Sequence, residues 1–200
     1  LFYITEYNNT MKGMNVGERI LASLFSATTA RTAGFNSVDT GSLTSASKLL
    51  TCVLMFIGGS PGSTAGGIKT TTIFILVVSL WSGITDRHKT AVFKRRFEDD
   101  AIKKASTVFT LNMFLAIFAL FTILAITDLS LSDVMFEVFS AIGTVGMTTG
   151  ITRDLSSAAR IIIMVLMFCG RVGSLSFALT FLQGKKDPPV YYPEEEISVG

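Results

Sequence analysis

Residues 105–148 read ASTVFTLNMFLAIFALFTILAITDLSLSDVMFEVFSAIGTVGMT, and this stretch decides the fold. Its first part, 105–127, is 23 residues long and carries no charge. About 20 mostly apolar residues are enough for a helix to cross a bilayer. A second helix at 133–142 is too short to cross, and a glycine loop at 143–148 follows it. This order predicts a spanning helix, a short helix that dips into the membrane, and a loop at membrane depth.

The same pattern occurs earlier in the chain at an offset of 112 residues. The sequence TAGF at 32–35 aligns with TVGM at 144–147, and the alignment runs without a gap to Gly58 and Gly170. A short helix predicted at 18–29 precedes the first glycine loop, 31–36, as the helix at 133–142 precedes the second. Both copies have the same polarity, so the axis that relates them follows the membrane normal, which is the symmetry of a pore.

A long apolar region follows each glycine loop. The second region, 155–183, contains one charge in its membrane segment, Arg171. The first, 42–82, is interrupted at 58–67 by GGSPGSTAGG. Five glycines and a proline in ten residues cannot continue a regular helix. The sequence therefore predicts two half-helices joined by an irregular loop, which a membrane tolerates only where the loop is buried in protein or lines a water-filled cavity.

We therefore expect an all-α membrane protein made of repeated units around a central pore, as in K⁺ channels. Each unit has a membrane helix, a pore helix, a filter loop and a second membrane helix. The first unit is 1–82, which lacks most of its first helix, and the second is 105–183. A linker at 83–104 joins them and a tail at 184–200 ends the chain. Residues 1–4 resemble the end of a helix, so we expect the chain to belong to a longer one.

The linker sets the expected orientation. Residues 85–104 hold seven Lys and Arg, whereas the turn at 128–133 holds two Asp and no basic residue. Basic loops are retained on the cytoplasmic side of a membrane. The linker is therefore predicted to be cytoplasmic in a multi-pass protein of the cell membrane, with the filter loops facing outside and membrane lipid around the helices.

Composition excludes several other classes of function. The chain is 49% hydrophobic and only 16% charged, against about a quarter charged in soluble domains. Its net charge of +2 gives no reason to expect nucleic-acid binding. Cys52 and Cys169 lie inside apolar runs and are predicted to be buried packing residues, and His88 has no companions for a metal site. No nucleophile–base pair is evident, so we do not expect an enzyme.

The glycine loops have the chemistry of an ion filter. A K⁺ filter replaces the water around the ion with rings of backbone carbonyl oxygens, and glycine tolerates the backbone angles that this requires. The C-terminal end of each short helix also carries partial negative charge, which favours a cation. We therefore predict that K⁺ binds to the backbone carbonyls of eight residues: Thr32, Ala33, Gly34, Phe35, Thr144, Val145, Gly146 and Met147.

Arg171 is predicted to act at the interrupted helix. A charge inside a membrane span is costly and marks function by default. At the offset of 112, Arg171 corresponds to Gly59, so it lies level with the glycine-rich interruption and is expected to donate to free carbonyls there. We predict that this loop obstructs the pore, that Arg171 holds it closed, and that Lys69 flanks the same cavity. The predicted gating loop is Gly58, Gly59, Ser60, Pro61, Gly62, Ser63, Thr64, Ala65, Gly66 and Gly67.

Three local predictions concern polar residues near the loops. Asn15 and Glu18 have the spacing of a capping box at the start of the first short helix. Ser42 and Asp154, which correspond at the offset of 112, are predicted N-caps of the helices that follow the glycine loops. Arg31 would repel a cation in the path, so we expect it behind the filter, paired with Glu18 or Asp39.

Four stretches resemble a known family. They are ARTAGFN at 30–36, FIGGSPGSTAGGIKTTT at 56–72, GTVGMTTG at 143–150 and GRVGSL at 170–175. Together they resemble the Trk/Ktr/HKT superfamily of K⁺ transporters, and most closely the membrane subunit of bacterial Ktr systems. The resemblance covers essentially all 200 residues but only about half of the family's chain, which has four membrane–pore–membrane repeats.

The resemblance implies a role for the chain as the third and fourth of these repeats, with the two N-terminal repeats supplied by the parent chain. It implies transmembrane transport of K⁺, possible coupling to or activation by Na⁺, a homodimer with one pore per subunit, and a cytosolic ring of nucleotide-binding regulatory subunits. It also implies a gating loop at 58–67 that contacts Arg171, and filter glycines at Gly34 and Gly146. Some relatives have serine at the first filter glycine and favour Na⁺.

Two alternatives remain open from the sequence. One is a secondary cation transporter that alternates access around the broken helix, or a relative that passes Na⁺. The parallel orientation of the two units argues against alternating access. The other is a non-conducting membrane anchor or regulatory subunit, which leaves both glycine loops and Arg171 without a role.

Overall fold

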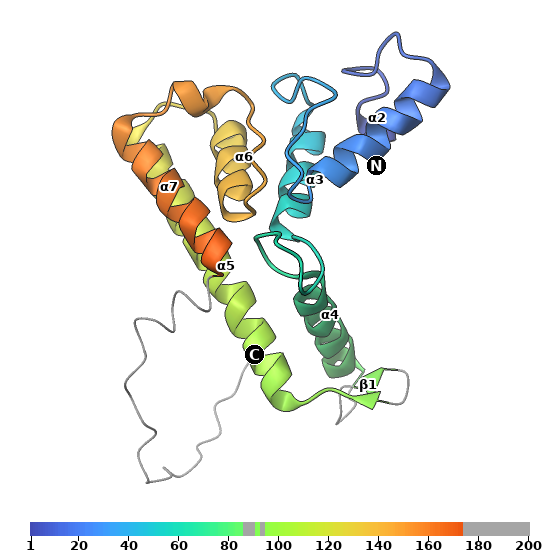
Figure 1. Ribbon diagram of the computed structural model, residues 1–200, viewed down its shortest axis with the longest axis vertical. Helices are drawn as coiled ribbons and strands as arrows, with labels where there is room; N and C mark the ends of the chain where they lie inside the picture. The colour runs from blue at the N-terminus through green and yellow to red at the C-terminus, as the bar shows by residue number, and fades with distance from the viewer. Residues whose placement is uncertain (86–90, 93–94, 174–200) are drawn as a thin grey trace.

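The computed structural model describes residues 1–85, 91–92 and 95–173, and within these ranges the chain is almost entirely helical (Figure 1). The elements in chain order are α1 (Phe2–Thr5), α2 (Val16–Thr29), α3 (Ser45–Phe56), α4 (Thr70–Ile84), β1 (Ala91–Val92), β2 (Arg95–Arg96), α5 (Asp99–Ile126), α6 (Leu131–Ile142), the 3₁₀ turn η1 (Ile151–Arg153) and α7 (Ser157–Val172).

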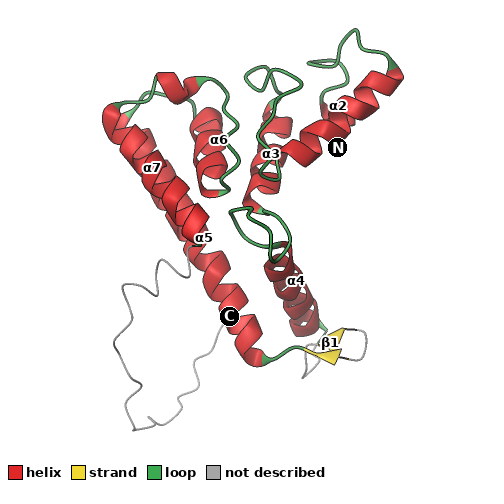
Figure 2. Cartoon of the chain, viewed as in Figure 1, coloured by secondary structure: helices red, strands yellow, loops and turns green. Residues whose placement is uncertain are grey.

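The helices form two arms. In one arm α5 and α7 lie side by side, with α6 packed against both (Figure 1). In the other arm α4 follows α3, and the 58–67 loop separates the two helices (Figure 2). The arms meet where α3 packs against α6 and where α4 packs against α5. The two short helices, α2 and α6, each lead directly into a glycine loop.

Helix α5 has the length and surface of a membrane span. Residues Asp100–Ile126 have a mean hydropathy of 2.3 in their most apolar window, and only 22% of that window is buried within the protein. Phe114, Ile117, Phe118 and Phe121 are all more than half exposed and follow the i, i+3, i+4, i+7 spacing of one helix face. A core helix of a soluble protein buries such a face, whereas here the described residues leave it uncovered. Among the described residues, α5 is the one helix long and apolar enough to cross a membrane, and α3 and α4 are shorter apolar helices.

The opposite face of α5 holds the core of the second unit. Ala116, Ala119 and Ile123 are at most 2% exposed and pack with side chains of α6 and α7. Small residues at a helix contact let the backbones approach closely, which is how helices associate in a membrane. The second unit is therefore a packed three-helix body around α6.

A separate apolar cluster joins the two units. It brings Ala30, Cys52 and Met55 of the first unit together with Phe136, Val145 and Met147 of the second. Phe56, the last residue of α3, makes an edge contact with Phe139, with ring centroids 5.4 Å apart. The prediction that Cys52 and Cys169 are buried is confirmed.

The observed N-caps of the helices agree only partly with those predicted from the sequence. The capping box is confirmed, since the Asn15 side chain accepts from the Glu18 N–H and the Glu18 carboxylate accepts from the Asn15 N–H. The predicted N-caps Ser42 and Asp154 are wrong. Thr44 and Ser156 are the caps instead. They lie two residues later and again correspond at the offset of 112, so the two units share the same turn into the helix.

Two predicted boundaries also differ from the structure. Helix α7 ends at Val172 because Gly173 has φ +91°, so the predicted helix 155–183 does not continue unbroken. Helix α5 begins at Asp99, which places the end of the predicted linker 83–104 inside a helix. The linker also contains a short antiparallel pair in which Ala91 faces Arg96 and Val92 faces Arg95. The tail 184–200 and residues 174–183 lie outside the described residues.

A buried carboxylate ties the start of the chain to α3. Glu6 is fully buried, and its oxygens accept from the Thr44 N–H at 2.9 Å and from the Thr44 and Thr10 hydroxyls at 2.8 Å. Burial alone raises the pKa of Glu6, but hydrogen bonds from Ser47, Thr44 and Thr10 outweigh it and lower the pKa to about 2. The carboxylate lies at the N-terminal end of α3, where the helix dipole favours negative charge.

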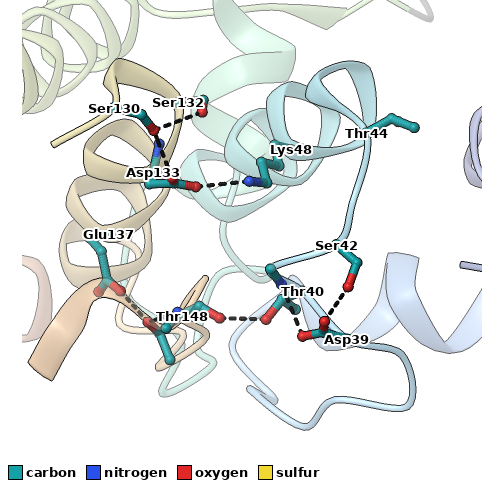
Figure 3. Close-up of polar contacts among 12 residues, drawn as sticks. Asp39, Thr40, Ser42, Thr44, Lys48, Ser130, Ser132, Asp133, Glu137 and Thr148 are labelled. Carbon is teal, nitrogen blue, oxygen red and sulfur yellow. Dashed lines mark hydrogen bonds and ion pairs between the residues drawn. The ribbon is translucent and has the colours of Figure 1, made fainter.

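One ion pair connects the units. Lys48 of α3 contacts Asp133 of α6 at 2.8 Å, with side chains only 11% and 24% exposed, and it is the only salt bridge found within the described ranges (Figure 3). Asp133 also accepts from the Ser130 hydroxyl at the start of α6. The pair therefore fixes the N-terminal end of α6 against α3.

We predict that Lys48→Met lowers the stability of the protein by about 2 kcal/mol, between the values for exposed and for fully buried pairs, because Asp133 then loses its cation. Thermal unfolding in detergent micelles measures the effect. Asp133→Asn and the double variant complete the cycle. A double variant whose loss equals the sum of the two single losses would show that the pair contributes no coupling energy.

Candidate functional site

Both glycine loops have the same unusual backbone. Thr32 and Gly34 have φ of +70° and +76°, and Thr144 and Gly146 have φ of +54° and +86°. The residue between them in each loop has a negative φ, so the sign alternates along the loop. Glycine adopts positive φ freely, whereas a threonine does so only where its surroundings compensate. The sequence predicted all four residues as part of the loops, but it did not predict the positive φ of the two threonines.

The two loops lie next to each other. A Cβ added to Gly34 would lie 2.3 Å from the carbonyl oxygen of Val145, so no side chain fits between the loops at this point. The side chains of Val145 and Met147 are buried in the cluster that joins the units, whereas Gly146 between them faces open space. Phe35 of the first loop is 71% exposed, and its carbonyl accepts from the Thr29 hydroxyl at 2.6 Å.

The 58–67 loop is closed at its base by backbone hydrogen bonds. The Gly58 N–H donates to the Ile68 carbonyl at 2.8 Å, and the Ile68 N–H donates to the Phe56 carbonyl at 3.1 Å. The Thr70 N–H donates to the Gly59 carbonyl at 3.2 Å, just before α4 begins. These bonds join the end of α3 to the start of α4, so the loop projects from a closed base.

Two cations satisfy carbonyls at the tip of this loop. An Arg171 guanidinium nitrogen donates to the Thr64 carbonyl at 2.5 Å, from the end of α7. The Lys69 ammonium donates to the carbonyls of Ser63 at 3.2 Å and Ala65 at 2.5 Å. The structure thus brings Arg171 and Lys69 to the same three residues of the loop, 63–65, with the Arg171 contact between the two Lys69 contacts.

The 58–67 loop also contacts the second glycine loop. The Gly66 N–H donates to the Thr144 hydroxyl at 3.0 Å. A Cβ at Gly66 would lie 2.4 Å from that hydroxyl oxygen and 2.6 Å from the threonine methyl carbon. Only glycine permits this approach, so the interruption in the first unit rests directly on the glycine loop of the second.

A cavity of about 630 Å³ adjoins this contact. Its wall includes Thr144, Val145, Gly146 and Met147 of the second glycine loop, and Arg171 below them. Glu137 of α6 lines the cavity as well, although only 6% of the residue is exposed. Sequence reasoning missed Glu137, and the signal for it was a carboxylate in the middle of a mostly apolar short helix.

The predicted pairing of Arg31 is wrong. Arg31 is exposed, and neither candidate partner contacts it in the described part of the chain. Glu18 is engaged in the capping box, and Asp39 accepts from the Ser42 hydroxyl and from the Gly41 N–H (Figure 3). Hydrogen bonds from Ser42 and Gly41 lower the pKa of Asp39. Both carboxylates are therefore used by their own turns.

Fold and site together define a class. The chain is a helical integral membrane protein with two units of like polarity. In each unit a short helix leads into a glycine loop along which the sign of φ alternates. The chain matches the TrkH family of cation transport proteins over residues 1–187 and belongs to that family.

Relatives cover nearly the whole chain. It is 36% identical to Ktr system potassium uptake protein B of Bacillus subtilis over 99% of this chain and 45% of the relative. It is 37% identical to potassium/sodium uptake protein NtpJ of Enterococcus hirae, over 100% of this chain and 46% of the relative. The chain thus spans about half the length of these curated relatives.

A solved structure shows the same fold. The potassium transporter TrkH from Vibrio parahaemolyticus matches with a TM-score of 0.73 at 18% identity, over 92% of this chain and 41% of that chain. The sequence-based prediction of an all-α membrane fold of this family is confirmed.

We predict that Gly66→Ala destabilises the protein by about 1–3 kcal/mol, the usual range for overpacking, because the new methyl group overlaps Thr144. Gly83→Ala in α4 is the matched control, since a Cβ there meets nothing within 4 Å. Melting temperatures in detergent compare the two. Equal melting temperatures for both variants would mean that the 58–67 loop does not rest on Thr144.

Proposed function

We propose that this chain forms part of the ion-conducting subunit of a K⁺ uptake system, with a gated pore lined by the two glycine loops. The observation that carries the proposal is the alternation of φ in both loops, at Thr32 and Gly34 and again at Thr144 and Gly146. Alternating signs of φ turn successive peptide groups to the same side of the strand, which is what a row of carbonyl ligands requires.

The surroundings of the loops support a cation path. Helices α2 and α6 end at Thr29 and Ile142, immediately before the loops, so the partial negative charge of each helix end lies beside its loop. The carbonyls of residues 32–35 and 144–147 are the proposed ion ligands. The Phe35 carbonyl is the weakest of these eight proposed ion ligands, because it already accepts a hydrogen bond from the Thr29 hydroxyl.

The 58–67 loop is the proposed gate. Its tip is held by Arg171 at Thr64 and by Lys69 at Ser63 and Ala65, and Gly66 rests against Thr144. In this closed arrangement the loop lies against the loop that binds the ion. Opening requires that Arg171 release the Thr64 carbonyl, so the balance between these bonds and solvation of the open loop sets the flux.

The rest of the assembly follows from the family. Because the chain spans about half of its relatives, we propose that it supplies the third and fourth of four repeats in a longer protein. The proposed subunit forms a homodimer whose cytosolic face binds a ring of nucleotide-binding regulatory subunits. The basic linker 85–104 is proposed to be cytoplasmic and the glycine loops to face outside.

The choice of ion has two candidate answers. Names of relatives include both a potassium and a potassium/sodium uptake protein, so Na⁺ is proposed as a second permeant, coupling or activating ion.

Alternating access around the broken helix remains the second mechanism, because α3 and α4 are separate helices joined by an irregular loop.

We predict that Gly146→Ser reduces the preference for K⁺ over Na⁺ by about tenfold, an energy of about 1.4 kcal/mol. Gly146 has φ +86°, which serine resists, so the carbonyls of the second loop should turn. The longer protein reconstituted in liposomes, assayed for K⁺ and Na⁺ flux, measures the ratio. Flux with unchanged selectivity would move the ion path away from this loop and favour alternating access.

We predict that Arg171→Ala raises K⁺ flux several-fold, because the Thr64 carbonyl loses its charged donor and the 58–67 loop is released. Arg171→Lys keeps one charged donor, so its K⁺ flux should lie between those of the wild type and of Arg171→Ala. Lys12→Ala, an exposed cation remote from the loop, controls for the loss of one charge. The same liposome assay reports the result, and an Arg171→Ala protein with lower flux would assign the arginine to conduction rather than closure.

A further inference from the structure

A buried carboxylate stands beside the second glycine loop without any role so far. Glu137 lies on α6 and is 6% exposed. Its Oε1 accepts from the Thr152 hydroxyl at 2.8 Å and from the Thr148 hydroxyl through a short hydrogen bond (Figure 3). A carboxylate is costly to bury unless it is hydrogen-bonded, so these donors account for its position.

Thr148 is the residue that these bonds hold. It directly follows Met147, the last residue of the second loop. Its hydroxyl donates to Glu137 and accepts from the Gly150 N–H at 2.9 Å. Its backbone carbonyl accepts from the hydroxyl of Thr40, in the first unit (Figure 3). The outer end of the second loop is thus fixed by its own short helix, by its own turn and by the neighbouring unit.

The first loop lacks this arrangement. At the offset of 112, Glu137 corresponds to Phe25 and Thr148 to Asn36. Phe25 is 43% exposed and has no carboxylate to offer. The first loop is held instead from Thr29, whose hydroxyl donates to the Phe35 carbonyl. Two loops of the same backbone therefore have different supports.

We propose that Glu137 is a positioning residue for cation selectivity, which holds the carbonyls of residues 144–147 in register through Thr148. The proposal rests on the function proposed above, in which these carbonyls bind the ion. A hydrogen bond to a charged acceptor is stronger and shorter than a neutral one, and a filter that distinguishes ions needs its ligands held within narrow limits.

The position of the Glu137 carboxylate on the cavity wall also supports a role in cation selectivity. Glu137 shares the 630 Å³ cavity with Val145, Gly146 and Met147, so its negative charge lies on the wall beside the proposed ligands. Arg153 and Arg171 line the cavity too, but within the described ranges neither forms a salt bridge with Glu137. The carboxylate is therefore held by hydroxyl donors and not by an ion pair.

The test compares variants in the longer protein, reconstituted in liposomes, by the ratio of K⁺ to Na⁺ flux. Glu137→Gln keeps the shape and removes the charge. Thr148→Val removes the hydroxyl at almost constant volume, and Thr148→Ser restores it. Ser132→Ala, on the same helix but outside the network, is the matched control. Gly146→Ser is run alongside as the measure of the proposed filter.

The expected result is a loss of at least fivefold in the flux ratio for Glu137→Gln and for Thr148→Val, with Thr148→Ser and Ser132→Ala within twofold of wild type. The double variant Glu137→Gln/Thr148→Val should lose no more than the larger single loss, because both changes act on the same charge-assisted bond. Should Glu137→Gln fail to insert, the Thr148→Val and Thr148→Ser pair decides the outcome.

Three results would overturn the proposal in distinguishable ways. A wild-type ratio in Glu137→Gln and Thr148→Val, with a lost ratio in Gly146→Ser, removes the role of Glu137 and leaves the filter intact. A wild-type flux ratio in Glu137→Gln, Thr148→Val and Gly146→Ser would contradict the proposed filter, and with it the proposed function. Equal loss in Thr148→Val and Thr148→Ser would mean that volume at this position, and not the bond to Glu137, controls selectivity.

Discussion

Backbone groups at membrane depth have no water to bond, and an unsatisfied N–H or carbonyl there costs several kcal/mol. The 58–67 loop meets this constraint most severely, because it breaks a helix and contains five glycines in ten residues. Its base is closed by the bonds of Gly58 and Ile68, and its tip by Arg171 and Lys69. The charges that look out of place in the sequence are thus the partners that the broken backbone requires. The approach of Gly66 to Thr144 depends on the same closed base.

The two repeated units share their backbone conformation and differ in the groups that hold it. The two units share the positions of positive φ and the N-caps Thr44 and Ser156 at one offset. They differ in what holds each glycine loop, a threonine hydroxyl in the first and a buried carboxylate in the second. They differ again after the loop, where α3 breaks into the 58–67 loop and α7 continues without such an interruption to Val172. The two units therefore share one backbone scaffold and differ in the groups that hold it.

Sequence patterns predicted the elements well where the signal was local. The capping box at Asn15, the break at 58–67 and the two loops of like sequence all depend on residues close together in the chain. Predictions failed where two sets of donors competed for one side chain, or where one backbone angle decided the outcome. Asp39 bonds to its own turn rather than to Arg31, and helix α7 ends where Gly173 takes a positive φ. A helix end of this kind depends on one backbone angle, which hydropathy does not report.

The sequence by itself determined the membrane class, the repeat, and the need for irregular loops, because hydropathy, spacing and glycine content act locally. Only the tertiary structure decided which groups meet. Gly66 reaches Thr144 across 78 residues of chain. The repeat predicted that Arg171 meets the 58–67 loop, but only the structure decided that its acceptor is the Thr64 carbonyl, 107 residues away. Glu137 shows the same limit, because a carboxylate in a short helix has no evident partner until the chain folds back to bring Thr148 and Thr152 beside it. Such contacts depend on the path of the whole chain through space, and no local pattern contains that path.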